Sequence, residues 1–274
     1  MDISVLMSVY AKEKPEYFTE AVNSIINQTI APKEIILVRD GLVPKQLQNA
    51  IDSFMDESKI EVKYIPLDEN GGLGNALNIG VKAASNELIA RMDTDDISVP
   101  DRFEMQLAEF MRRPELDVIG GQVTEFETSV SEPVGKRNVP RSNDEIAIYL
   151  KKRNPLNHPT VMFKKTAVIN AGNYADRHYV EDYDLWCRMQ INGCRFENLS
   201  ETLVYMRVTP DTYARRGGMK YFRSLKKLEQ DKLDMKIISK GIYLENVAIR
   251  FAQCVLSCGS FRRVVYQRML REQE

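Results

Sequence analysis

From its start to an acidic stretch at residues 93–96, the chain alternates short apolar-rich segments with segments whose apolar residues recur at every third or fourth position. The apolar-rich segments at residues 3–9, 34–38 and 87–92 predict buried strands, and Ile60, Val62, Tyr64 and Ile65 predict another strand. The periodic positions between them predict helices, and they are Phe18, Ala21, Val22, Ile25 and Ile26, then Leu47, Ile51 and Phe54, then Leu77, Val81 and Ala84. This order predicts parallel strands joined by right-handed crossovers.

The pattern becomes less regular in the second half of the chain. The predicted elements are a helix opened by Pro100 with Phe103, Leu107 and Phe110 on one face, strands over 117–123 and 157–163, and a helix carrying Leu185 and Met189. Two more helices are predicted near the C-terminus, one with Leu225, Leu228, Met235 and Ile238, the other with Leu244, Val247, Ala248, Phe251, Cys254, Val255 and Cys258. Residues 127–143 are polar and rich in turn formers, and a loop of that length is usually functional or mobile.

Composition places the chain among globular proteins, since 43% of its 274 residues are hydrophobic. No apolar run reaches the roughly 18 to 20 residues of a membrane span, and the first seven residues do not resemble a signal peptide. We therefore expect a cytoplasmic protein. The four cysteines form no CxxC pair, which favours buried free thiols over a zinc site or a disulfide scaffold.

The net charge of −1 is unevenly distributed along the chain. Residues 1–214 carry 24 Lys and Arg against 33 Asp and Glu, a net charge of −9, whereas residues 215–274 carry 14 against 6, a net charge of +8. Two regions with different partners are predicted by this asymmetry. The basic region has no recognisable nucleic-acid-reading motif, so nucleic acid is not an expected partner.

Three carboxylates follow a predicted buried strand in the stretch Arg91-Met92-Asp93-Thr94-Asp95-Asp96. At the carboxyl edge of an open α/β sheet, where such folds bind ligands, their hard oxygens suit Mg²⁺ or Mn²⁺ bridging a diphosphate. A solvated turn before a helix would also favour Asp. The stretch by itself leaves both interpretations open.

Other polar positions carry the same ambiguity. The glycines of residues 70–75 would let backbone N–H groups approach a ligand or would form a helix-entry turn, and they match neither G-x-G-x-x-G nor a P-loop. Glu181 and Asp182 lie in the first turn of a predicted helix, where acids also complement the helix dipole. His158 could be a hydrogen-bonded structural residue. Trp186, the only tryptophan, has packing as its default role.

Taken in order, these motifs resemble family 2 glycosyltransferases of the GT-A fold, close to the branch that builds bacterial O-antigen, capsule and exopolysaccharide. The matching segments are residues 4–10, Val38-Arg39-Asp40-Gly41, Asn70-x-Gly72-x-x-x-Ala76-x-Asn78-x-Gly80, residues 91–96, residues 158–163 and residues 181–186. The resemblance runs from Ile3 to about Arg207. It implies an α/β catalytic domain over residues 1–214, with a mostly parallel nucleotide-binding sheet flanked by helices, and a basic helical extension over residues 215–274.

Roles for individual residues follow from the resemblance. Asp40 would accept a hydrogen bond from the uracil of a UDP-sugar, with Tyr10 beside the base. Asp93 would face the ribose and the metal, and Asp95 would be the main protein ligand of Mg²⁺ or Mn²⁺. Asp182 would be the catalytic base. The acceptor-binding residues would be Glu181, Trp186 and His158.

The expected activity is transfer of a single hexose or related sugar from a UDP-sugar to a hydroxyl of a lipid-linked saccharide. The Q-x-x-R-W motif of processive synthases is absent, since the region reads Tyr213-Ala214-Arg215-Arg216-Gly217-Gly218. One carboxylate acting opposite the departing diphosphate implies inversion at the anomeric carbon. The alternatives are a non-catalytic sugar-nucleotide-binding protein and a sugar nucleotidylyltransferase, although the latter would need a glycine-rich loop where residues 10–15 contain no glycine.

Residues 244–271 combine apolar side chains with arginines, the composition of an interfacial helix on anionic lipid. This pattern predicts peripheral contact with the inner face of the plasma membrane. The alternatives are that these helices cap the catalytic domain or form a homodimer contact.

Overall fold

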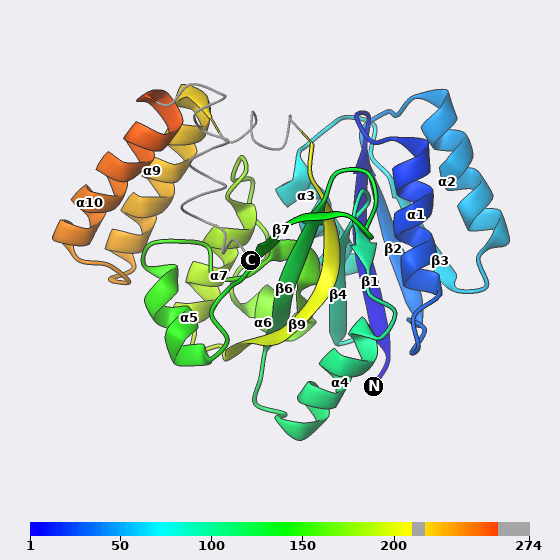
Figure 1. The fold of residues 1–274 in the computed structure, drawn as a ribbon, viewed down its shortest axis with the longest axis horizontal. Coiled ribbons are helices and arrows are strands. Elements are labelled where there is room, and N and C mark those ends of the chain that lie inside the picture. Colours follow the sequence, from blue (N-terminus) through cyan, green and yellow to red (C-terminus); the bar gives the residue numbers. More distant parts are fainter. Residues whose placement is uncertain (210–216, 257–274) are drawn as a thin grey trace.

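A mixed sheet forms the centre of the computed structural model, which describes residues 1–209 and 217–256 (Figure 1). The strands are β1 (Ile3–Tyr10), β2 (Glu34–Asp40), β3 (Glu61–Pro66), β4 (Leu88–Asp93), β5 (Ile97–Ser98), β6 (Val118–Phe126), β7 (Pro133–Arg137), β8 (Met162–Lys164) and β9 (Phe196–Arg207). The helices are α1 (Pro15–Ile26), α2 (Lys45–Glu57), α3 (Leu73–Ala83), α4 (Arg102–Arg112), α5 (Asn143–Leu150), α6 (Lys165–Asn170), α7 (Glu181–Ile191), α9 (Gly218–Asp234) and α10 (Lys240–Phe251). The strand order is β3-β2-β1-β4-β8-β6-β9-β5, and β7 pairs with β6.

The first four strands form the predicted parallel half of the sheet, with β1 between β2 and β4. Val5 and Met7 belong to one buried cluster and Leu6 to the other, so β1 is covered on both faces as its apolar run predicted. Parallel strands end at the same edge. Tyr10 therefore pairs in register with Asp40, and Ser8 with Asp93.

The second half of the sheet contains antiparallel pairs that periodicity did not indicate. Strand β8 runs antiparallel to both β4 and β6, whereas β6 and β9 are parallel. The segment predicted as a strand over 157–163 begins instead as a short 3-10 turn, His158–Thr160, and only its last residues join β8. The hydroxyl of Thr160 bonds to the backbone of Asn157 and accepts from Gly121, which stabilises this turn.

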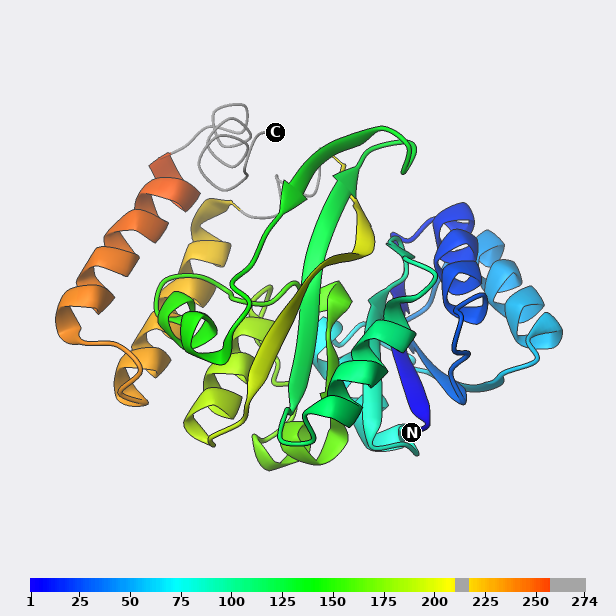
Figure 2. The ribbon, with the colours of Figure 1, turned by 60° about the horizontal axis from the view of Figure 1, so that its bottom comes forward.

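The polar segment 127–143 is not a plain loop, since it contains β7 and the start of α5. Figure 2 shows the β6–β7 hairpin rising beyond the rest of the sheet. Strand β7 pairs with one neighbour and remains largely exposed, so it lacks the apolar alternation of a core strand. Helix α5 begins with a capping box in which Ser142 accepts from the backbone of Glu145 and Glu145 bonds back to Ser142.

Helices cover both faces of the sheet. One buried cluster joins the sheet to α1, α2 and α4 through Phe18, Leu47 and Phe103, and the other joins it to α3 and α7 through Leu77 and Leu185. In Figure 1, α1 and α2 lie beside β1–β3, at the end of the molecule opposite α9 and α10. The predicted α/β class, a sheet flanked by helices, is confirmed.

Both C-terminal helices form near their predicted positions, and they share a core with the sheet domain. Phe222, Leu225 and Leu228 of α9 lie in the same buried cluster as Trp186 of α7. Helix α10 continues into a π-helical turn, Ala252–Leu256. The predicted arginine-rich segment over 257–271 lies outside the described residues, so the membrane prediction rests there on sequence. Within the described part of the chain, no helix has the length and hydropathy needed to span a bilayer.

Candidate active site

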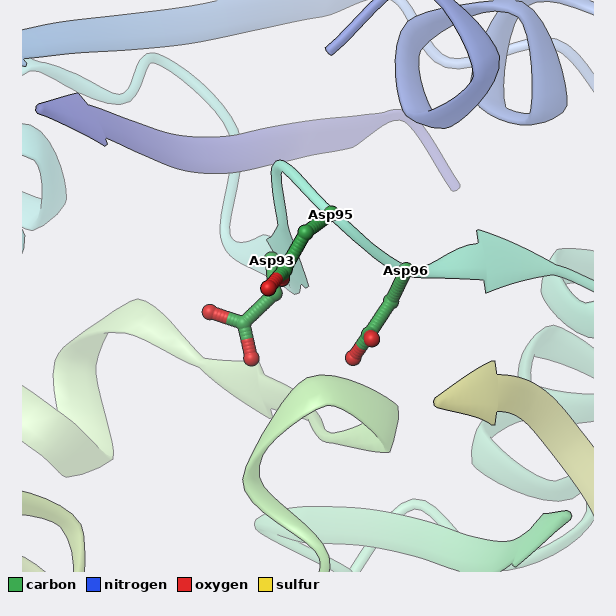
Figure 3. Close-up of side chains that lie close together, drawn as sticks. All are labelled: Asp93, Asp95 and Asp96. Atoms are coloured by element: carbon green, nitrogen blue, oxygen red, sulfur yellow. The ribbon is translucent and has the colours of Figure 1, made fainter. Parts of the chain in front are cut away.

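Three carboxylates gather at the carboxyl end of β4. Oxygen atoms of Asp93, Asp95 and Asp96 lie within 4.8 Å of one another, and the three side chains project to the same side of the turn between β4 and β5 (Figure 3). Asp93 forms an ion pair with the buried guanidinium of Arg91, two residues earlier on the strand. The sequence motif therefore produces a true cluster rather than a solvated turn.

The electrostatics of this cluster indicate a site for a cation. Burial, together with the charges of Asp93 and Glu13, raises the pKa of Asp95 to about 7. Burial and the charges of Asp95 and Asp93 raise the pKa of Asp96 well above its usual value, and its Oδ2 has no hydrogen-bond partner among the described residues. A divalent cation would supply both the missing ligand and the missing charge. The residues present therefore fit Mg²⁺ or Mn²⁺, with Asp96 added to the two predicted ligands.

The turn that presents these acids is fixed by Arg207, at the end of β9. The Arg207 backbone N–H donates to Asp96 Oδ1 at 2.9 Å, and its Nε donates to the Asp95 carbonyl at 3.1 Å. Its guanidinium lies 4.0 Å from the ring centroid of Tyr17. The sequence contains no local signal for this role of Arg207, because Arg207 approaches the turn only through the pairing of β5 with β9.

Glu13 is a fourth acid next to the cluster, and the sequence analysis did not predict it. Glu13 lies in the loop after β1 and accepts a hydrogen bond from the Thr94 hydroxyl at 2.7 Å. Burial raises its pKa, and the nearby charge of Asp93 raises it further. The polar loop composition of residues 11–15 contained no signal that this one acid turns inward.

Asp40 and the glycine-rich turn meet at the adjoining strand end. The two carboxylate oxygens of Asp40 accept from the backbone N–H groups of Gly71 and Gly72 at 2.7 and 3.0 Å. Gly72 has φ = 86°, a left-handed conformation that favours glycine. Asp40 is therefore buried in a structural contact that the sequence did not predict. A carboxylate has further lone pairs, so a bond to a base remains chemically available.

Helix α7 presents the second group of acids. The Oδ1 of Asp182 accepts from the Tyr183 N–H at 2.7 Å, and its Oδ2 accepts from the Asn154 side chain at 2.6 Å. Burial raises the pKa of Asp182, and these two bonds oppose the rise. Burial and the neighbouring charge of Asp182 raise the pKa of Glu181 to about 8. Asp182 is partly exposed whereas Glu181 is buried.

The two acidic groups lie within electrostatic range of each other. The pKa of Glu181 is raised mainly by burial, then by Asp182, and to a smaller extent by the charge of Asp93. Arg91 opposes the burial-driven rise in pKa at both Asp95 and Asp182. Residues at the end of β4 and at the start of α7 therefore lie near enough to each other for their charges to affect each other's protonation.

His158 and Trp186, the other two predicted acceptor-binding residues, are both buried. The His158 Nε2 lies 2.9 Å from the Tyr174 hydroxyl, and burial lowers the pKa of His158 well below its usual value, so the ring is neutral. Trp186 is 0% exposed, with its ring centroid 6.2 Å from that of His158 and 6.4 Å from that of Phe196. A fully buried side chain cannot line a pocket, so Trp186 is corrected to a packing role beneath His158.

Comparison with known proteins gives a consistent result. The family model described as Glycosyl transferase family 2 matches residues 4–171. The UDP-Gal:alpha-D-GlcNAc-diphosphoundecaprenol beta-1,3-galactosyltransferase of Escherichia coli is 36% identical over 268 residues, covering 98% of this chain and 96% of the relative. The amylovoran biosynthesis glycosyltransferase AmsE of Erwinia amylovora is 38% identical over 233 residues, covering 85% and 86%.

The fold of this chain is also similar to that of solved glycosyltransferase structures. The mannosyltransferase PcManGT from Pyrobaculum calidifontis, in complex with GDP-Man and Mn²⁺, superposes with a TM-score of 0.64 at 11% identity. The superposition covers 98% of this chain and 81% of that one.

Proposed function

The chain belongs to glycosyltransferase family 2 and has the GT-A fold, and from this premise we propose that it transfers one sugar from a UDP-sugar to a saccharide hydroxyl with inversion of the anomeric carbon. Its relatives are glycosyltransferases of bacterial polysaccharide synthesis. The observation that supports the proposal most is the acidic cluster at the end of β4, together with a second acidic pair at the start of α7 that lies within electrostatic range of it.

The two groups suit the two halves of the reaction. Asp93, Asp95 and Asp96 would hold a divalent cation, which would neutralise the charge developing on the departing diphosphate. Asp182 would take the proton of the acceptor hydroxyl as general base. Its raised pKa supports this role, because a base works best with a pKa near the operating pH. The acceptor hydroxyl would attack the anomeric carbon on the face opposite the departing nucleoside diphosphate, which would invert the configuration of that carbon.

Donor binding is assigned to the adjoining strand ends. Tyr10 and Asp40 pair in register at the carboxyl edge of β1 and β2, next to Asp93. We assign the base to this edge, with Asp40 both holding the glycine-rich turn and facing uracil. One relative's name specifies UDP-Gal as its donor, which supports a UDP-sugar here.

Acceptor binding is assigned to the side of α7. Glu181 would be protonated at neutral pH, because its pKa is about 8, so it could donate a hydrogen bond to an acceptor oxygen. His158 would contribute to acceptor binding through its hydrogen bond to the Tyr174 hydroxyl, and Trp186 would hold the His158 ring in place by packing against it. The same relative acts on a diphosphoundecaprenol-linked GlcNAc, which supports a lipid-linked saccharide as acceptor.

A transfer assay would test the proposal. We would incubate the enzyme with UDP-, GDP- and dTDP-sugars, Mn²⁺ and a GlcNAc-diphospholipid, and determine the anomeric configuration of the product by NMR. Transfer from a UDP-sugar with inversion is expected. Retention of configuration would refute the mechanism, and transfer only from another nucleotide sugar would refute the donor assignment.

We also propose that the C-terminal region attaches the enzyme to the cytoplasmic face of the membrane. On α10, Leu244 is 66% and Phe251 is 38% exposed, seven residues apart and so on one face. Residues 215–274 carry a net charge of +8. Each basic residue near an anionic surface contributes about 1 kcal/mol, so attachment should be reversible and sensitive to salt.

We expect full-length protein to sediment with anionic liposomes at low salt and to be released at high salt. A Leu244→Ser/Phe251→Ser variant and a truncation after residue 259 should each bind more weakly, because they remove apolar contact and arginines respectively. Neutral liposomes are the control. If full-length protein stays in the supernatant at low salt, the helices are a structural cap or a dimer contact.

A further inference from the structure

A fully buried ionic cluster lies between α9 and α10, away from the acidic site. Lys232 and Glu229 are both 0% exposed, and the Lys232 Nζ lies 2.9 Å from a carboxylate oxygen of Glu229. Asn246 of α10 also donates to this carboxylate, with its Nδ2 2.8 Å from Glu229 Oε2. This cluster therefore joins the two C-terminal helices to each other.

Burying this ion pair is energetically unfavourable, so a contribution to stability does not by itself explain its presence. Removing two charges from water is energetically unfavourable, and well-packed apolar residues of similar volume are often as stabilising as a buried pair. A buried ion pair can contribute geometric specificity, because each of its hydrogen bonds requires a partner at a particular position. The partners of Lys232 outside its own helix are therefore informative.

Those partners belong to α7 and to the end of α5. The Lys232 Nζ donates to the Tyr183 hydroxyl at 3.0 Å and to the Lys151 carbonyl at 2.9 Å. The Asn246 side chain donates to the same Lys151 carbonyl at 2.8 Å. The Tyr183 hydroxyl in turn donates to the Leu150 carbonyl. One ammonium group thus ties the first turn of α7 to the C-terminus of α5.

These two segments hold the oxygens of Asp182. Tyr183 follows Asp182 in the chain and supplies the N–H bonded to its Oδ1, while Asn154 lies three residues after Lys151 and bonds its Oδ2. We propose that Lys232, from the C-terminal helices, is a positioning residue that sets the orientation of the Asp182 carboxylate through Tyr183 and the end of α5. This inference rests on the proposed role of Asp182 as base.

The proposal gives the C-terminal helices a part in catalysis. Small displacements of a catalytic group are costly, since an error of about 1 Å can lower a rate about 100-fold. Donor binding takes place at the ends of β1, β2 and β4, which Lys232 does not contact. Its loss should therefore act on turnover and leave donor affinity unchanged.

Lys232→Met tests this directly, with Lys227→Met as the matched control because Lys227 lies on the same helix and is exposed. We expect kcat to fall about 10- to 100-fold for Lys232→Met, with UDP-sugar affinity within about 2-fold of wild type and no change for Lys227→Met. If Lys232→Met does not fold, Tyr183→Phe decides, since it removes only the hydroxyl between Lys232 and Leu150. Normal kcat per folded enzyme in the variant that folds would overturn the proposal.

A double-variant comparison separates positioning from simple destabilisation. In an Asp182→Asn background, Lys232→Met should lower turnover little further, because the effects of two substitutions that act through the same group are not additive. If the two effects multiply, Lys232 acts independently of Asp182 and the proposal fails. Near-normal turnover of Asp182→Asn alone would instead refute the proposed base, whatever Lys232 does.

Discussion

Asp182→Asn should lower turnover at least about 100-fold while leaving UDP-sugar affinity within a few-fold of wild type. The amide keeps the shape of the side chain and its contact with the Tyr183 N–H, but it cannot take the acceptor proton. Donor affinity measured by calorimetry and turnover measured with saturating acceptor would separate the two effects.

Two further variants sharpen this result. Asp176→Asn is the matched control, because Asp176 is an exposed acid in the segment before α7, and it should behave as wild type. Glu181→Gln should retain most turnover if Glu181 is protonated and only binds the acceptor, as its pKa of about 8 indicates. Near-normal activity of Asp182→Asn, combined with a severe loss in Glu181→Gln, would move the base to Glu181.

Asp95→Ala is expected to remove the metal dependence of UDP binding and to lower turnover at least about 100-fold, because it removes a central carboxylate of the cluster. In wild type, EDTA should weaken UDP binding at least about 10-fold, since the cation would join the chain to the diphosphate. Calorimetry with Mn²⁺ and with EDTA provides the measurement. Equal UDP affinity in wild type under both conditions would contradict the metal assignment.

The same variant should change how the stability of the metal-free protein depends on pH. The folded pKa of Asp95, about 7, lies above its usual value of 3.8, so between these values the folded protein binds a proton that the unfolded chain does not. Stability therefore falls as pH rises from about 4 to about 7, and the penalty is complete above the folded pKa. One pKa unit corresponds to about 1.4 kcal/mol, and for these coupled acids we expect a total loss of about 1 to 3 kcal/mol.

Urea denaturation in EDTA at pH 5 and pH 8 would measure this loss. Asp95→Ala should lose less stability between the two pH values than wild type, and Mn²⁺ should reduce the loss in wild type because it binds the ionised form of the cluster. An unchanged difference between pH 5 and pH 8 in Asp95→Ala would show that Asp95 is not the source.

The sequence determined the half of the fold built from local patterns. The apolar runs of β1, β2 and β4, the alternating apolar positions of β3 and the periodic apolar positions of α1 to α4 indicated a parallel sheet flanked by helices, and the end of β4 located the acidic cluster. The order of the motifs also identified the family. These inferences succeeded because burial on both faces and turns at strand ends leave their pattern within a few neighbouring residues.

Tertiary structure decided the features whose residues are far apart in the chain. Strand β7 is an exposed edge without apolar alternation, and no local signal linked Arg207 to Asp96 or Asn154 to Asp182. The capping box of α5 is different, because Ser142 and Glu145 are only three residues apart in the chain.

The predicted division at residue 214 illustrates the same difference. Composition separates a basic C-terminal region from an acidic catalytic region, yet Lys232 is buried against Tyr183, which adjoins the proposed base. Charge along the chain records average composition, whereas the role of one buried ammonium depends on which hydrogen-bond acceptors the fold brings to it. Those acceptors come from α5, α7 and α9, and only the packing of these helices places them around a single side chain.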